Sequence, residues 1–89
     1  STSHNNDTAA MIYFNLQDFD NALKYSNESI KLDGTPSKPQ HLFTRAQILV
    51  KLGEITKAKK DLEDAFYFES DWDDGYEDAK KLLKEISKN

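Results

Sequence analysis

The sequence predicts an all-α fold of two helical hairpins followed by a fifth, capping helix. Apolar residues recur at spacings of three and four along most of the 89-residue chain, which is the period of amphipathic helices. No segment alternates apolar and polar residues for long enough to indicate a strand. One strong break at residues 34–39, a second break at residues 69–75 and two weaker ones divide the pattern. The expected helices cover residues of about 5–16, 19–32, 39–52, 54–68 and 73–87.

In the first expected hairpin, apolar and small residues share one face of each helix. Ala10 and Tyr13 lie one turn apart in the first helix, and Ala22 lies on the apolar stripe of the second. Asp18 stands just before the second helix, where its carboxylate can accept hydrogen bonds from the unpaired N–H groups of the first turn. These positions predict where the two helices pack on each other.

The second expected hairpin follows the Pro- and Gly-rich stretch at residues 34–39. Pro39 falls in the first turn of a helix, where its missing N–H costs little. Ser37 and Gln40 have the spacing of a capping box, in which each side chain satisfies a backbone N–H of the helix start. Ala46 and Ala58 provide the small residues of this hairpin.

The fifth expected helix carries one apolar face and a lysine-rich end. Tyr76, Ala79 and Leu83 recur at helical spacing. Positive side chains near the C-terminus of a helix are favourable because they oppose its dipole. The lysines in this position are Lys80, Lys81, Lys84 and Lys88.

Composition limits the classes of function. The chain has 16 acidic and 12 basic residues, for a net charge of −4, whereas a nucleic-acid-binding domain normally shows a basic excess. It has no cysteine, so a reducing compartment is permitted and a cytoplasmic location is expected. No apolar run approaches the roughly 20 residues that span a bilayer. Because the chain does not begin with Met, it is expected to be a piece of a longer protein.

The hairpins contain a repeat with an offset of 36 residues. The offset places small residues on small residues and large apolar residues on large apolar ones. A third, partial match places Tyr76 over Leu42 and Leu83 over Leu49, so the last helix begins another unit. The main pairs are Ala10 with Ala46, Tyr13 with Leu49, Ala22 with Ala58 and Ser29 with Ala65.

The two segments QDFDNALKYSNESIKLDG and GEITKAKKDLEDAFYFES are variants of one pattern, and the sequence resembles the tetratricopeptide repeat family over nearly its whole length. The resemblance implies a right-handed α-solenoid, with residues 1–89 forming one domain. Its parts would be repeat one at about 3–36, repeat two at about 39–72 and a capping helix at about 73–87. An unrelated five-helix bundle is the alternative, because any antiparallel hairpin needs small residues where its helices cross.

The chain departs from the family pattern at several positions. Asn6 stands where the family prefers a large aromatic residue, which is expected to weaken the first helix. Gly34 and Ser70 replace the usual proline between units.

The resemblance implies a non-catalytic protein–protein interaction module: an adaptor, a scaffold or a co-chaperone-like segment that binds a peptide or partner helix in a concave groove. The alternatives are self-association, further repeats in the parent protein that cover this face, and a face that is merely solvated. Beside His4 and Glu77, the residues expected to line the groove are Asp7, Met11, Asn15, Phe43, Thr44, Gln47, Val50, Lys51, Asp74, Asp78 and Lys81.

One subclass of the family binds acidic chaperone tails through a clamp of lysines, asparagines and an arginine. The matching positions of the last helix hold Asp74 and Asp78, which would repel a carboxylate. Binding of such tails is therefore expected to be absent.

The sequence contains no convincing catalytic, metal or cofactor site. It has no nucleophilic cysteine and no glycine-rich phosphate loop. A calcium loop built on Gly75 would put Ser70, Trp72 and Lys81 at positions that require acidic ligands. His4 and His41 lie far apart in the sequence and are expected at the surface. No enzyme activity, metal or cofactor is therefore expected.

Overall fold

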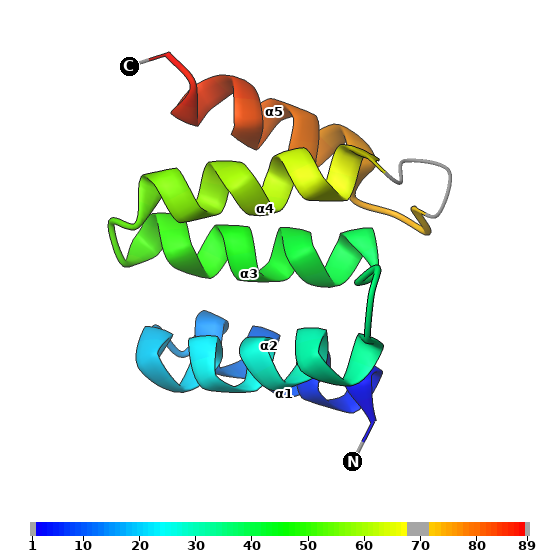
Figure 1. Ribbon diagram of the computed structural model, residues 1–89. Helices are drawn as coiled ribbons and strands as arrows, with labels where there is room; N and C mark the ends of the chain where they lie inside the picture. Colours follow the sequence, from blue (N-terminus) through cyan, green and yellow to red (C-terminus); the bar gives the residue numbers. More distant parts are fainter. Residues whose placement is uncertain (1, 68–71, 89) are drawn as a thin grey trace.

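The computed structural model describes residues 2–67 and 72–88, which contain five α-helices and no strand. Figure 1 shows the helices stacked in layers, with the α1–α2 hairpin at one end, the α3–α4 hairpin in the middle and α5 at the other end. The all-α fold of two hairpins and a fifth helix is confirmed. The helices are α1 (Ser3–Asn15), α2 (Phe19–Asp33), α3 (Pro39–Lys51), α4 (Ile55–Tyr67) and α5 (Tyr76–Ile86).

The small residues of the repeat lie where the helices cross. Ala10 and Ala22 are fully buried in the first hairpin, as are Ala46 and Ala58 in the second. Ser29 is also fully buried. Because these side chains are short, the paired helices can approach closely, as the repeat predicts.

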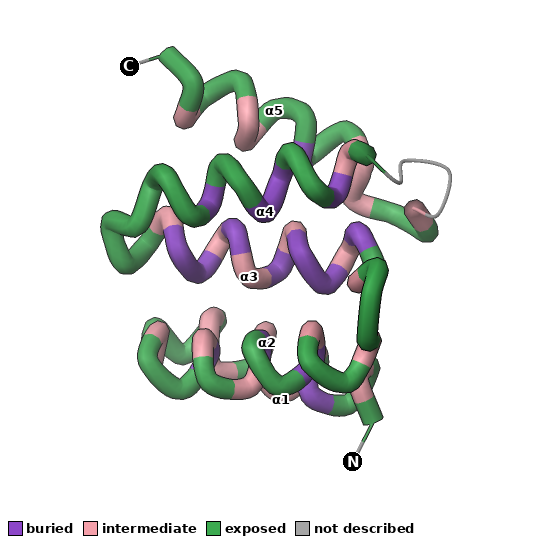
Figure 2. The backbone as a smooth tube through the Cα atoms, viewed as in Figure 1, coloured by how far each residue is buried: buried purple, intermediate pink, exposed green. Residues whose placement is uncertain are grey.

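Helix α3 forms the centre of the core. It contacts α1, α2 and α4, and Figure 2 shows buried residues along its whole length. Ile48 packs with Ala10 and Ala22 on the side of the first hairpin. Leu49 packs with Leu62 and with Ala79 of α5 on the other side. The apolar side chains of α3 therefore hold the successive layers together.

The two hairpin turns repeat the same backbone geometry at the 36-residue offset. Gln17 and Gly53 both have positive φ, at 62° and 80°. In the first turn Gln17 N–H donates to Phe14 O and Asp18 N–H to Tyr13 O, and the second turn has the same pair of bonds 36 residues later. This is the paired bonding of a Schellman motif, so the repeat extends from the side chains to the turns.

The start of α2 agrees with the sequence prediction, whereas the start of α3 differs from it. Asp18 caps α2 as expected, accepting from Asn21 N–H at 3.2 Å. The predicted capping box of Ser37 is wrong, because Lys38 is the N-cap of α3 and makes no side-chain cap bond. Asp33 accepts a hydrogen bond from the Lys38 N–H instead, at 3.1 Å. A residue from the preceding helix thus replaces the local cap.

The start of α5 was predicted too early. The helix begins at Tyr76 rather than near residue 73. Gly75 is its N-cap and has a left-handed backbone with φ of 80°, a conformation that glycine adopts without steric cost. Residues 68–71, including Ser70 and the expected end of α4 at residue 68, lie outside the described residues.

A half-buried ion pair joins the two helices of the second hairpin, and its arginine also hydrogen-bonds to the first hairpin. Arg45 of α3 binds both carboxylate oxygens of Asp61 of α4, each at 2.8 Å. Its remaining guanidinium nitrogen donates to the side-chain oxygen of Asn27 of α2, at 3.1 Å. This bidentate geometry fixes both distance and orientation, so Arg45 sets the position of three helices at once.

Among the described helices, none combines the length and apolar content needed to cross a bilayer.

Candidate functional site

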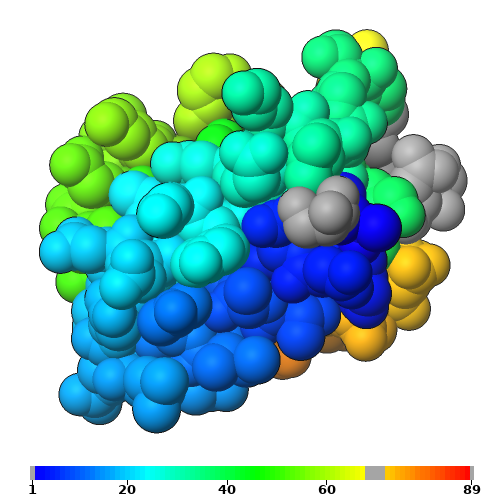
Figure 3. All heavy atoms as spheres, turned by 90° about the horizontal axis from the view of Figure 1, so that it is seen from below, coloured from blue at the N-terminus to red at the C-terminus, as the bar shows by residue number. Residues whose placement is uncertain are grey.

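A hollow of about 430 Å³ opens where the starts of α1 and α3 meet the segment before α5. Figure 3 shows the blue start of α1 next to the gold segment that precedes α5. We call this hollow the α1–α3 groove. It is lined by His4, Asp7 and Met11 of α1, by Lys38, Gln40, His41, Phe43, Thr44 and Gln47 at or in α3, and by Asp73 and Asp74.

The groove brings together some of the residues expected from the sequence and leaves others out. Those that line it are Asp7, Met11, Phe43, Thr44, Gln47 and Asp74. Those that do not are Asn15, Val50, Lys51, Asp78 and Lys81. Whether any of these residues binds a partner stays a prediction.

Four of these five residues lie outside the groove for identifiable reasons. Asn15 and Lys51 are the last residues of α1 and α3, whereas the groove lies at the helix starts. Val50 packs against the core. Lys81 lines a different hollow. Helical periodicity gives the face on which a residue lies, but not which end of that face is hollowed.

The sequence prediction also missed four lining residues. These are Lys38, Gln40, His41 and Asp73. Gln40 stands one turn before Thr44 and so shares its face, which is a signal that could have identified it. Asp73 adjoins Asp74 in the segment that closes the groove.

His41 is buried, so the expectation of a surface histidine is wrong. Only 2 % of its surface is exposed. Its Nδ1 lies 2.9 Å from Asp33 Oδ2 and 3.0 Å from Ser3 Oγ. The Ser3 hydroxyl also contacts Asp33 and donates to Ser29 O at 2.9 Å. We call these three side chains the Ser3–Asp33–His41 cluster, and they join α1, α2 and the start of α3.

The cluster has the residue types of a hydrolytic triad but not its geometry. In a triad, the serine and the carboxylate bind opposite nitrogens of the imidazole ring. Here Ser3 and Asp33 both contact Nδ1 of His41. The serine and the carboxylate therefore share one ring nitrogen, and the imidazole does not lie between them as it does in a triad.

Carboxylates dominate the charge of the groove. Asp7, Asp73 and Asp74 face one lysine, Lys38. Gln40 is held in place because its Nε2 donates to Asp73 Oδ2 at 2.9 Å. The groove is thus acidic, and a hydrogen bond to Asp73 holds the side-chain amide of Gln40 in place.

Two acceptor atoms at the groove are buried without a donor among the described residues. They are Oδ1 of Asp7 and Oε1 of Gln40. Burial raises the pKa of the Asp7 carboxyl above its ordinary value, while the nearby Thr44 hydroxyl and the histidines His41 and His4 act to lower it. A buried acceptor that loses its water and gains no donor destabilises the folded state. Burial of Asp7 Oδ1 is therefore expected to lower the free energy of unfolding.

We expect Asp7→Asn to stabilise the protein at neutral pH. A carboxyl whose pKa is raised on folding favours the fold below its unfolded pKa, near 3.8, and this contribution is lost as the pH rises through the folded pKa. The amide carries no charge and does not titrate. A gain of about 1 kcal/mol would raise the melting temperature by roughly 4–8 °C.

Thermal melts of both proteins at pH 3 and pH 7 would check this expectation. The variant should have a higher melting temperature than the parent at pH 7. The two melting temperatures should be equal at pH 3, where Asp7 is protonated. A variant that melts lower than the parent at pH 7 would show that the carboxylate is stabilising.

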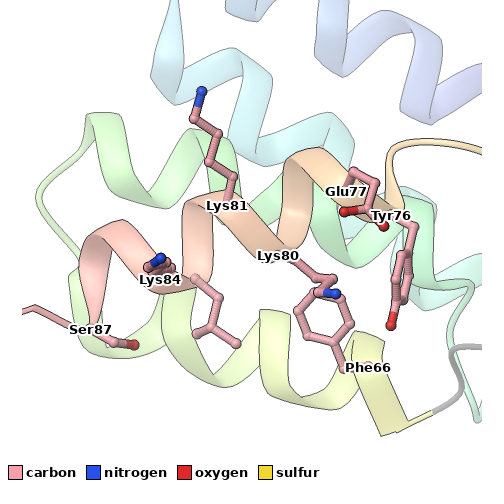
Figure 4. Close-up of a pocket in the computed structure, with 8 residues that line it drawn as sticks. Phe66, Tyr76, Glu77, Lys80, Lys81, Lys84 and Ser87 are labelled. Carbon is pink, nitrogen blue, oxygen red and sulfur yellow. The ribbon is translucent and has the colours of Figure 1, made fainter.

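A second hollow, of about 610 Å³, lies between α4 and α5, and we call it the α4–α5 hollow. Figure 4 shows the Lys80 side chain beside the rings of Phe66 and Tyr76, with Lys81 pointing away from them. The Lys80 ammonium lies 5.3 Å from the centre of the Tyr76 ring, within the range of a cation–π contact. Of the residues expected in the groove, Lys81 and Glu77 are found here.

The described residues contain no group of three or more histidine, cysteine, aspartate or glutamate side chains that could hold a metal ion.

A family model described as tetratricopeptide repeat matches the chain twice, at residues 6–36 and 42–71. The two matches together cover more than half of the sequence and correspond to the two helical hairpins. No curated protein and no solved structure matches the chain.

Proposed function

Because the chain belongs to the tetratricopeptide repeat family, whose repeats are generally protein–protein interaction modules, we propose that it binds an extended segment of a partner protein in the α1–α3 groove. The observation that carries this proposal is the composition of the groove wall. Side chains from both repeats and from the segment before α5 converge on one hollow. A bound peptide would touch all three parts of the fold.

The lining suits a peptide better than a small apolar ligand. Met11 offers a flexible apolar contact, while Gln40 and Gln47 offer amide groups to a peptide backbone. Pockets for small molecules are usually lined mainly by apolar side chains. We propose a non-catalytic role, as an adaptor or scaffold segment, for residues 1–89 acting as one domain. The cytoplasmic location stays a prediction.

We expect substitutions that fill the groove to abolish capture of the partner. Met11→Arg combined with Gln47→Arg places two long side chains in the groove while leaving Phe43 in place. Phe43 is kept because its ring packs 6.3 Å from that of Trp72. Loss of a central contact region commonly costs more than about 2 kcal/mol of binding energy. Affinity capture followed by mass spectrometry should show a partner that the parent chain retains and the double variant loses.

Leu32→Arg combined with Thr56→Arg is the matched control. Both positions are exposed, uncharged and absent from the groove lining. This control should retain the partner. Equal retention by the groove variant, or equal loss by the control, would contradict a role for the groove.

Self-association is the second candidate function. Ile12 and Leu16 at the end of α1 are 55 % and 69 % exposed, and repeat proteins bury apolar faces mainly against neighbouring units. Light scattering over a range of concentrations distinguishes the two candidates. A monomer at high micromolar concentration would argue against self-association.

A further inference from the structure

We propose that the segment bound in the α1–α3 groove is basic and places a lysine or arginine side chain between Asp7, Gln40 and Asp73. This inference rests on the proposed function, because it specifies the chemistry of the partner at the same groove. It is carried by two features of the groove: its charge and its unpaired acceptors.

The charge of the groove favours a positive ligand. Three carboxylates line it, and none of them forms an ion pair within the described part of the chain. Lys38 is the opposing lysine, and His41 already contacts Asp33. Complementary charge steers association and excludes partners of the wrong sign.

The unpaired acceptors favour a ligand that donates hydrogen bonds. Asp7 Oδ1 and Gln40 Oε1 come from different helices, and both lack a donor among the described residues. An ammonium group carries three donors and a guanidinium group five, with no acceptor in either. A carboxylate ligand would bring only further acceptors. Hydrogen bonding thus selects the same partner as charge does.

The Gln40 acceptor is positioned before any ligand arrives. Gln40 is fixed through its Nε2 bond to Asp73 Oδ2, which leaves its oxygen free to accept. Thr44 is buried, and its hydroxyl donates to Gln40 O at 3.1 Å. Preorganised groups lose little conformational entropy on binding. The desolvated Asp7 carboxylate would also gain a counter-charge on complex formation.

Binding of three short fluorescent peptides to the full 89-residue chain tests the inference. The peptides share one uncharged backbone and differ only in two central positions, which hold lysine, glutamine or glutamate. We expect the lysine peptide to bind at least about tenfold more tightly than the glutamine peptide, and the glutamate peptide to bind most weakly. Raising the salt concentration should reduce this difference.

A pair of matched variants locates the effect. Asp7→Asn with Asp73→Asn should reduce binding of the lysine peptide to the level of the glutamine peptide. Asp20→Asn with Glu63→Gln changes the net charge equally at exposed acids outside the groove and should leave the preference intact. Circular dichroism of all variants would show that each is folded.

The outcomes separate this inference from the proposed function. If the glutamine or glutamate peptide binds as tightly as the lysine peptide, and Met11→Arg with Gln47→Arg abolishes that binding, the basic-partner inference is wrong while groove binding stands. If no peptide binds at millimolar concentration, or the groove-filling variant binds all of them unchanged, both proposals are wrong. Equal loss of lysine preference in both acid variants would also overturn the inference, because bulk charge would then account for it.

Discussion

Replacing Ala58 by tryptophan is expected to disrupt the α3–α4 hairpin. Ala58 is fully buried and belongs to the cluster that contains Ala46, Leu49 and Leu62. An indole at this position cannot fit unless the two helices move apart. Overpacking a core typically costs about 1–3 kcal/mol, and the change from methyl to indole lies at or beyond the upper end. A loss of about 3 kcal/mol would lower the melting temperature by roughly 12–24 °C.

Thermal unfolding followed by circular dichroism would measure this effect. Lys59→Trp is the control, because Lys59 is the next residue of α4 and is exposed. It should melt close to the parent protein. An unchanged melt for Ala58→Trp would mean that the helix crossing does not lie at this position.

Asp33→Ala is expected to produce the second large loss of stability. The Asp33 carboxylate contacts the Ser3 hydroxyl, His41 Nδ1 and the Lys38 N–H, and its side chain is 2 % exposed. Removing it leaves several buried or half-buried polar groups without their partner. Each such group costs about 1–3 kcal/mol, so we expect a total near 3 kcal/mol.

Urea denaturation would measure the change, with Asp20→Ala as the control on the same helix. Asp20 is exposed in the first turn of α2 and should cost less than about 1 kcal/mol. Asp33→Asn should fall between the two, because its side-chain oxygen still accepts. If Asp33→Ala and Asp20→Ala were equally stable, the Ser3–Asp33–His41 cluster would contribute nothing to folding.

The repeat could be predicted because its signal is local and periodic. Small residues at Ala22 and Ala58, spaced 36 residues apart, determine where each hairpin crosses, and both are fully buried. Asn6 shows the limit of this kind of inference. It stands in place of a large aromatic residue, yet it is buried and its side-chain amide donates to Thr2 O at 2.8 Å. At this position the family pattern predicts an aromatic ring packed in the core. Here a buried amide fills it instead and hydrogen-bonds to the start of the helix.

The groove could be predicted only in part, because contacts between residues far apart in the sequence decide its position. Ser3 and His41 are 38 residues apart, and nothing in the sequence near either one indicates their contact. The same applies to Asp33, which caps α3 through Lys38 in place of the expected Ser37. Asp7 and Gln47 are expected in the groove because the resemblance to the family implies that these positions of α1 and α3 line it, and both do line the hollow.

The position of His41 divides the groove wall into fixed and variable parts. His41 is buried and contacts Asp33 of α2, and Thr44 is buried and donates to Gln40 O within α3, so both tolerate little change. The side chains of Met11 and Gln47 make no hydrogen bond within the described residues, and Asp74 is exposed. Substitutions at Met11, Gln47 and Asp74 could therefore change which peptide sequences the groove binds. They would leave the contacts between the two repeats intact.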